Sequence, residues 1–272
     1  MTREFKTYTP YSEYERYEAK THDAMVLLLR RPIVESIERY EWLINELDRG
    51  IFKFHLFEIG SGSCWGLNKV RKKFPGKLVI GADINNVALT EGPPRVATNV
   101  VQSDLAKGLS FREGCFSTIV CFLVLEQIDP CMIGKLFNDL RSVAKSGAKL
   151  ILATFNRHLF SPRGRRWFTP NRYEYTTEEL RSQLVNNGWF PKKKYGQRFV
   201  EPHTYNLQAA IAQATEDALV RVPGLQEKPL IQIFSHRMLN ILPSIMPYVS
   251  VEPAGEHSMR KPVIDLLVCQ KA

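Results

Sequence analysis

Short apolar segments alternate with helix-length segments through the middle of the chain. The apolar runs are rich in Val, Ile, Leu or Phe, and polar or Gly/Pro residues bound each of them; they are FKFHLFEIG (52–60), KLVIGADI (77–84), VATNVVQSD (96–104), FSTIVCFLV (116–124) and AKLILATFN (148–156). Such runs are typical of strands that are buried on both faces. The segments 65–74, 85–92 and 130–144 between them predict helices. The alternation predicts a doubly wound α/β fold, in which helices cover both faces of a parallel sheet.

The segments before and after this core show different patterns. Residues 24–47 have apolar residues at helical spacing, with Pro32 as a break or a helix start and Gly50 closing the segment. A long loop is expected over 156–175. A helix should follow it, with Thr177 as its N-cap and Asn187-Gly188 at its end.

The last third of the chain predicts two further strands around a helical segment. GQRFVEP (196–202) is a candidate sixth strand, and PVIDLLVCQ (262–270) predicts the last one. Residues 204–249 between them are helical in pattern and unusually long for a connection. This insertion is expected to pack on the sheet, to cover a hydrophobic ligand, or to lie on a membrane surface.

Composition adds little beyond the class of protein. The 272 residues include 37 Lys and Arg and 28 Asp and Glu, so the formal charge is +9, which favours an anionic partner weakly. No uninterrupted apolar stretch is long enough to span a membrane, and the first residues lack a signal-peptide pattern. The 5 cysteines form no C-x-x-C pair. They predict reduced thiols in a cytoplasmic protein, with neither a disulfide framework nor a metal site.

A glycine-rich turn follows the first predicted strand, over EIGSGSCWG (58–66). Glycines there permit a tight bend and the close approach of a ligand to the backbone. Asp83 ends the second strand 21 residues after Gly62, and Asp104 ends the third strand another 21 residues on. Because the carboxyl ends of parallel strands form the ligand crevice, Glu58, Asp83 and Asp104 predict a nucleotide-type site. The alternative is ordinary turns, in which Gly and Asp are common.

The type of ligand can be narrowed from the same residues. A dinucleotide fingerprint needs a third glycine where Trp65 stands, and no G-K-[ST] follows as a P-loop requires. Glu58 would face a pyrophosphate unfavourably and suits a ligand that carries an ammonium group. Asp83 is placed to accept hydrogen bonds from both hydroxyls of a ribose.

At this point the sequence resembles the class I S-adenosylmethionine (SAM)-dependent methyltransferases, whose first motif is [DE]-x-G-x-G-x-G. Glu58, Gly60 and Gly62 match it, whereas Cys64 stands at the third glycine. The fourth strand, FSTIVCFLVLEQ (116–127), resembles the family pattern F-D-x-V-x-S-x-x-V-L-E-H. It departs from that pattern at its second, sixth and last positions, which here are Ser117, Cys121 and Gln127.

The resemblance implies a Rossmann-like fold with a mostly parallel seven-stranded sheet and an antiparallel last strand. It implies SAM as cofactor and S-adenosyl-L-homocysteine (SAH) as product, with Asp83 on the ribose and Asp104 at the adenine amine. The cofactor-binding residues that it suggests lie at strand ends; they are Glu58, Gly60, Ser61, Gly62, Asp83, Ile84, Asp104, Leu105, Cys121 and Leu123. The expected organisation is a helical lid (1–50), the SAM-binding core (51–203), a helical insertion covering the substrate (204–250) and the last core strand (251–272).

Candidate substrate and catalytic residues lie outside the core pattern. The tyrosines near the N-terminus (Tyr11, Tyr14 and Tyr17) predict a lid over the substrate, or else a packing helix. Arg163, Arg165 and Arg166 cluster in the loop after the fifth strand and predict a phosphate or carboxylate site, or else a solvated basic surface. His158 and His203 are candidate general bases, with ordinary surface histidines as the alternative.

Three functions compete. The leading hypothesis is methyl transfer to a small-molecule acceptor such as a natural product, sugar or lipid-linked intermediate, with O-methylation favoured. An RNA methyltransferase is the second, based on the arginine loop and on the basic segments KVRKKF (69–74) and PKKKYGQR (191–198). Against it, no [DNS]-P-P-[YFW] motif follows the fourth strand. The third is a SAM-binding regulator without catalytic activity.

Overall fold

A computed structural model describes residues 11–18, 24–90, 99–160, 173–202, 251–255 and 261–272. Within the helices, the side chains of Tyr17, residues 24–32 and Phe160 are not described. The described residues therefore do not include Arg163, Arg165, Arg166, His203 or the insertion over 204–249. The predictions made for them stay predictions.

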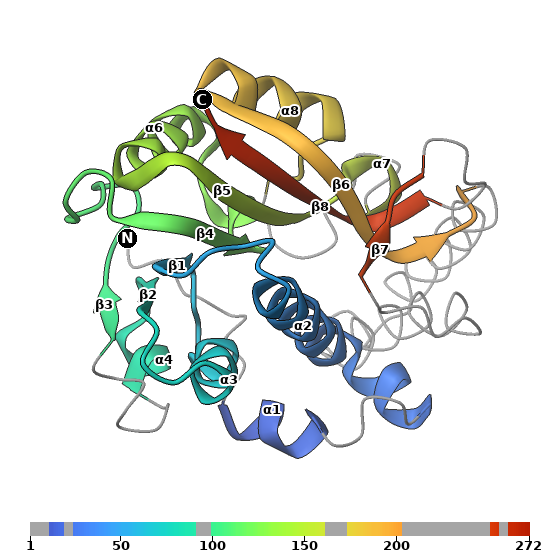
Figure 1. Cartoon of the computed structure of the whole chain (residues 1–272). Coiled ribbons are helices and arrows are strands. Elements are labelled where there is room, and N and C mark those ends of the chain that lie inside the picture. Colours follow the sequence, from blue (N-terminus) through green and yellow to red (C-terminus); the bar gives the residue numbers. More distant parts are fainter. Residues whose placement is uncertain (1–10, 19–23, 91–98, 161–172, 203–250, 256–260) are drawn as a thin grey trace, which may run out of the picture.

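A mixed eight-stranded sheet forms the centre of the molecule (Figure 1), with the order β3-β2-β1-β4-β5-β8-β6-β7. β1 pairs in parallel with both β2 and β4, β2 pairs in parallel with β3, and β4 with β5. The strands are β1 (Leu56–Ile59), β2 (Val79–Asp83), β3 (Val100–Gln102), β4 (Phe116–Phe122), β5 (Ala144–Phe155), β6 (Trp189–Val200), β7 (Glu252–Pro253) and β8 (Lys261–Lys271). The Rossmann-like α/β fold with a mostly parallel sheet is confirmed.

The antiparallel part of the sheet is more extensive than the sequence predicts. β8 runs antiparallel to both β5 and β6, as expected for the last core strand. The sixth strand begins at Trp189, well before the predicted start at Gly196, because pairing with β8 extends across the lysines at 192–194, with a register shift between Pro191 and Lys193. The short β7 adds an eighth strand, antiparallel to β6. Strand formation here follows from the neighbouring strand rather than from local propensity.

Helices cover both faces of this sheet and produce two core clusters. On one face, α2 (Ala24–Asp48) and α3 (Trp65–Lys73) bury residues such as Ile37 and Leu67 against β1, β5 and β8. On the other face, α6 (Ile133–Val143) and α8 (Thr177–Asn186) bury residues such as Phe137 and Leu184. The remaining helical segments are shorter; they are α1 (Tyr11–Glu18), α4 (Asn86–Thr90), α7 (Arg157–Phe160), η1 (Leu125–Gln127) and η2 (Pro130–Met132).

Several predicted boundaries change in the structure. α2 continues through Pro32, so this proline neither starts nor ends the helix. The N-cap of α8 is Thr176 rather than Thr177, because Thr176 and Glu179 form a reciprocal capping box. The predicted helix over 130–144 consists of η2 and α6, and Ala144 already belongs to β5. α7 lies within the predicted loop.

The strand order reverses between β1 and β4, since β2 and β3 lie on one side of β1 and β5 lies beyond β4. At such a switch point, the connections from two neighbouring strands leave in opposite directions and open a crevice at the carboxyl ends. Within the described ranges, no helix is long and apolar enough to cross a membrane. The same ranges contain no cluster of three His, Cys, Asp or Glu residues that could hold a metal ion.

Candidate functional site

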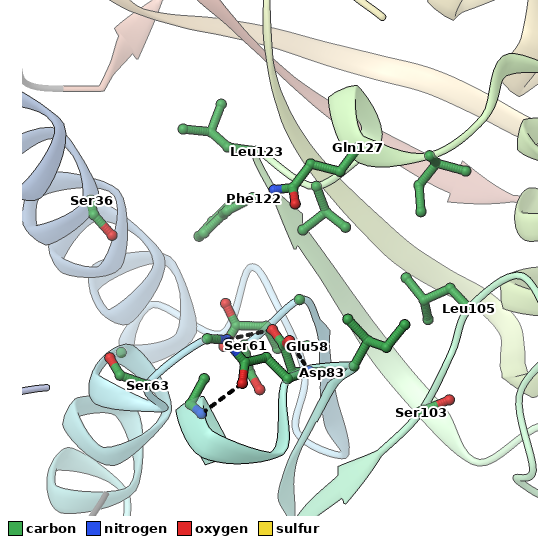
Figure 2. A pocket seen from close by; sticks show the side chains of 18 of the residues that line it. Ser36, Glu58, Ser61, Ser63, Asp83, Ser103, Leu105, Phe122, Leu123 and Gln127 are labelled. Carbon is green, nitrogen blue, oxygen red and sulfur yellow. Dashed lines mark hydrogen bonds between the residues drawn. The ribbon is translucent and has the colours of Figure 1, made fainter. Parts of the chain in front are cut away.

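A cavity of about 740 Å³ lies at the carboxyl ends of β1, β2 and β4, where the strand order reverses. Figure 2 shows Ser61 and Asp83 on one side of it and Phe122, Leu123 and Gln127 on the other. The turn after β1 and the end of β2 form the first side, whereas the end of β4 and the start of η1 form the second. Residues from α2 complete the wall.

The turn after β1 is held by the aspartate that ends β2. Gly60 and Gly62 have positive φ angles of 67° and 53°, which glycine adopts without strain. One carboxylate oxygen of Asp83 accepts a hydrogen bond from the backbone N–H of Gly62 at 2.8 Å, and the other accepts from Asn85 at 2.9 Å. Asp83 therefore fixes the turn as well as lining the cavity.

Glu58 is buried at the floor of the cavity, where Tyr40 of α2 donates its hydroxyl hydrogen to Oε1. The other oxygen, Oε2, is buried and has no hydrogen-bond partner among the described residues. Burial raises the pKa of the Glu58 carboxyl to about 8, and the negative charge of Asp83 adds to the rise. An unpartnered acidic oxygen inside a cavity suits a ligand that brings an ammonium group.

Helix α2 contributes Ser36, Arg39 and Tyr40 to the wall, and the sequence analysis identified none of them. Tyr40 packs directly on Gly66 in the first turn of α3, where an added Cβ would come within 2.0 Å of its ring. A larger residue at Gly66 would thus displace the tyrosine that contacts Glu58. Helical spacing predicts α2 itself, but it does not show which residues face a cavity built by other segments.

The side formed by β4 is largely apolar. Phe122 and Leu123 line it, together with Phe155 from the end of β5. Leu123 has a φ of 56°, in the left-handed region that leucine rarely adopts, and its N–H donates to the carbonyl of Ala153 at 2.8 Å. Backbone strain of this kind is often found at ligand sites.

The structure brings most of the predicted cofactor-binding residues to the cavity. Those that line it are Glu58, Gly60, Ser61, Gly62, Asp83, Ile84, Asp104, Leu105 and Leu123. Cys121 does not line it; its side chain is fully buried in the core beneath α6. The alternation of side chains along β4 explains this difference, because Phe122 points to the opposite face.

Of the predicted substrate and catalytic residues, Tyr14 lines the cavity, where its ring stacks on Trp65 at a centroid distance of 5.0 Å. Tyr11 is buried beside it and accepts a hydrogen bond from the side-chain amide of Asn68. His158 is exposed on α7 and is not among the described residues that line the cavity. Tyr17 lies in α1, but its side chain is outside the description; Arg163, Arg165, Arg166 and His203 are outside it entirely.

The strand order and the glycine turn match the architecture of class I methyltransferases, and the comparison with known families agrees over part of the chain. Residues 57–152 match the sequence model of a methyltransferase domain, from β1 into β5. None of the curated proteins matches the chain.

Solved structures share the fold at low sequence identity. A SAM-dependent methyltransferase from Thermotoga maritima has a TM-score of 0.55 at 13% identity, over 95% of this chain and 99% of that one. A sarcosine dimethylglycine methyltransferase from Galdieria sulphuraria, so named provisionally, gives 0.55 at 15% identity, over 88% of each chain. Geranyl diphosphate C-methyltransferase from Streptomyces coelicolor gives 0.53 at 14% identity, over 94% of this chain and 84% of that one.

Residues 57–152 therefore match a methyltransferase domain, and the fold is one that SAM-dependent methyltransferases share. SAM supplies a methyl group that its sulfonium centre has already activated. The unpartnered Oε2 of Glu58 and the open backbone at Gly62, where an added Cβ would meet nothing within 4 Å, fit such a cofactor. The contribution left to the protein is to bind the two reactants, to orient them and to exclude water.

Proposed function

We propose that this methyltransferase transfers the methyl group to a small-molecule acceptor, and that the acceptor atom is an oxygen. The observation that carries the proposal is this cavity, which runs from the glycine turn to the apolar side chains of Phe122 and Phe155. Its volume of about 740 Å³ is in the range of small-molecule sites. The solved structure of geranyl diphosphate C-methyltransferase contains geranyl diphosphate, and this small ligand on a similar fold supports the proposal.

We assign the cofactor to the side of the cavity that the glycine turn forms. Asp83 accepts hydrogen bonds from the ribose hydroxyls, in addition to its two backbone bonds. Glu58 pairs with the ammonium group of the cofactor through Oε2. Ile84, Asp104 and Leu105 surround the adenine, because they line the cavity at the ends of β2 and β3.

This assignment leaves the apolar side for the acceptor. Among the described residues that line the cavity, none is a histidine, and Glu58 and Asp83 already accept hydrogen bonds. An acceptor oxygen that is already anionic, such as a carboxylate or a phenolate, needs no base before it attacks the methyl carbon. The side chains at this end then act by orienting the acceptor and excluding water. His158 and His203 stay candidates for an acceptor that must lose a proton.

The RNA hypothesis is weakened by the partners of the basic segments. Lys69 of KVRKKF forms ion pairs with Glu18 and Glu41. Arg198, at the end of PKKKYGQR, forms an ion pair with Glu35. Lys192 and Lys193 lie near Lys149, in the half of β5 that is distant from the cavity. These charges therefore do not converge on the site of methyl transfer as a phosphate-binding track would.

The test is methyl transfer from isotopically labelled SAM into a metabolite extract and, separately, into total RNA. The proposal expects label in a small molecule, and mass spectrometry should locate it on oxygen. Nuclease-sensitive label in RNA would establish the second hypothesis instead. SAH binding without any label incorporation would favour the regulator that lacks catalytic activity.

A further inference from the structure

Arg39 is the buried cation of the cavity wall. Its side chain lies on α2 and is 3% exposed, and its guanidinium carbon is 5.8 Å from the centroid of the Phe122 ring. Nη1 donates a hydrogen bond to the side-chain oxygen of Gln197 at 2.7 Å. Nε is buried and has no hydrogen-bond partner among the described residues.

The carboxylate that is best placed to pair with Arg39 along α2 is Glu35, but it is bound by another arginine. Glu35 lies one helical turn before Arg39 on α2, at the spacing that favours an ion pair along a helix. Arg198 of β6 instead holds both oxygens of Glu35, with hydrogen bonds of 2.7 and 2.9 Å. Two further carboxylates near Arg39 also have other contacts, since Glu58 accepts from Tyr40 and Glu126 accepts from Thr154 and Phe155.

A buried guanidinium whose hydrogen bond goes to a neutral amide is costly, because the carboxylates near it offset only part of the hydration that it has lost. Burial lowers the pKa of Arg39, and the charge on Glu35 opposes this effect. Arginine nevertheless stays protonated in proteins. Its free N–H therefore points to an anion that enters the cavity, and a planar carboxylate or a phosphate fits its fork of donors.

We infer that Arg39 binds an anionic group of the methyl acceptor, a carboxylate or a phosphate, at the end of the cavity that Phe122 and Phe155 form. The inference rests on the proposed function and narrows its class of substrate. Two contacts assign Arg39 to the acceptor end, the Phe122 ring and the side chain of Gln197, while its charge also acts on Glu58. Gln197 belongs to β6, and β4, β5 and β8 separate that strand from the glycine turn after β1.

The test measures anion binding to the protein saturated with SAH, using benzoate and phenyl phosphate as probes in titration calorimetry. Arg39→Met should weaken the binding of both probes by about ten-fold or more, because charge-assisted pairs are the strong ones. Arg39→Lys should retain part of it. Lys149→Met, which removes a positive charge outside the cavity, is the matched control and should bind the probes like wild type.

A second variant tests the role of Arg198 while Arg39 stays in place. Arg198→Met should release Glu35 to pair with Arg39, so probe binding should be lost in this variant too. The double variant Glu35→Gln/Arg198→Met removes the competing carboxylate and should restore it. Loss followed by restoration is not expected from a general defect in folding, which circular dichroism would detect in addition.

Two outcomes would overturn the inference. One is that wild type with bound SAH takes up neither probe, or that Arg39→Met takes them up as well as wild type. The other is that Arg39→Met weakens SAH binding by about ten-fold or more but leaves 5′-methylthioadenosine, which lacks the amino-acid moiety, unaffected. Arg39 would then hold the carboxylate of the cofactor. A wild-type protein that fails to bind SAH would instead contradict the proposed function itself.

Discussion

The two sides of the cavity are constructed differently. On the cofactor side, the glycine turn and Asp83 come from successive strands, and the hydrogen bond between Gly62 and Asp83 spans 21 residues. On the acceptor side, the contact between Arg39 and Gln197 spans 158 residues, and that between Glu35 and Arg198 spans 163. The first side is a local motif. The acceptor side forms only when α2 packs against β6, because its contacts join these two elements.

This difference explains why the first side can be recognised in a sequence and the second cannot. A strand, a tight turn and a helix fix the relative positions of Glu58 and the glycines by local geometry. Nothing near Arg39 distinguishes it from a solvated arginine on an amphipathic helix. Substitutions on the cofactor side should therefore lower ligand affinity through lost ligand contacts. Substitutions on the acceptor side should lower stability through lost packing and charge pairing.

The largest expected effect is on the cofactor side. Asp83→Ala removes both proposed ribose hydrogen bonds, and charge-assisted bonds contribute about 1.5–3 kcal/mol each. SAH affinity should fall by about a hundred-fold or more, as measured by calorimetry. Because Asp83 also accepts from Gly62 and Asn85, the variant should be less stable as well. Unchanged affinity would contradict the assignment of Asp83.

The acceptor side should respond in stability instead. Glu35 and Arg198 have side-chain exposures of 2% and 11%, so their ion pair is largely buried. Removing one partner of such a pair typically costs about 3–5 kcal/mol, and Glu35→Gln, which leaves both Arg198 and Arg39 without this carboxylate, should lower the free energy of unfolding by about 3 kcal/mol in urea denaturation. SAH affinity should stay within about two-fold of wild type, because neither Glu35 nor Arg198 is among the described residues that line the cavity. A large loss of affinity would remove the distinction between the two sides.

A pH series examines the cofactor side further. The pKa of Glu58 is about 8 in the free protein, against 4.5 for the unperturbed group. Its burial therefore disfavours the folded free protein increasingly as pH rises from 4.5 toward 8. An ammonium group favours the ionised carboxylate, so SAH binding should release a proton and become tighter as pH rises toward 8.

Glu58→Gln is the control for this series, since it keeps the hydrogen bond from Tyr40 but cannot ionise. The variant should bind SAH about ten-fold more weakly near neutral pH, because it loses a charge-assisted hydrogen bond. It should also lose the proton release that calorimetry detects in buffers of different ionisation enthalpy. Equal pH dependence in both proteins would assign the titration to another group.

Particular residues show how far the sequence could take the fold. Apolar runs predict the parallel strands because burial on both faces requires them. The lysines at 192–194 obscure the first half of β6, which pairing with β8 imposes from outside the segment. Thr176 and Thr177 are both good caps, and the geometry of Glu179 selects the first. Cys121 stands at the serine position of the family pattern, but its place on β4 turns its side chain into the core.

The smallest expected effects concern two tyrosines on α1. The sequence predicts this segment either as a lid or as a packing helix. Tyr14 lines the cavity, so Tyr14→Ala should weaken SAH binding by removing part of the cavity wall. The lost stack on Trp65 should also cost about 0.5–1.5 kcal/mol of stability. Tyr11 is buried, is not among the residues that line the cavity, and accepts a hydrogen bond from Asn68. Tyr11→Phe should cost about 1 kcal/mol of stability with unchanged affinity.

Comparing Tyr14 with Tyr11 separates the two interpretations, because both residues belong to α1 but only Tyr14 lines the cavity. Thermal unfolding without ligand and SAH titration should be measured for both variants and for a deletion of residues 1–20. If α1 acts as a lid, the deletion and Tyr14→Ala should share the loss of affinity, and the deletion should add the stability loss of Tyr11→Phe. If both single variants lower the unfolding temperature and neither changes SAH affinity, α1 is a packing helix. The cofactor side would then be complete without it.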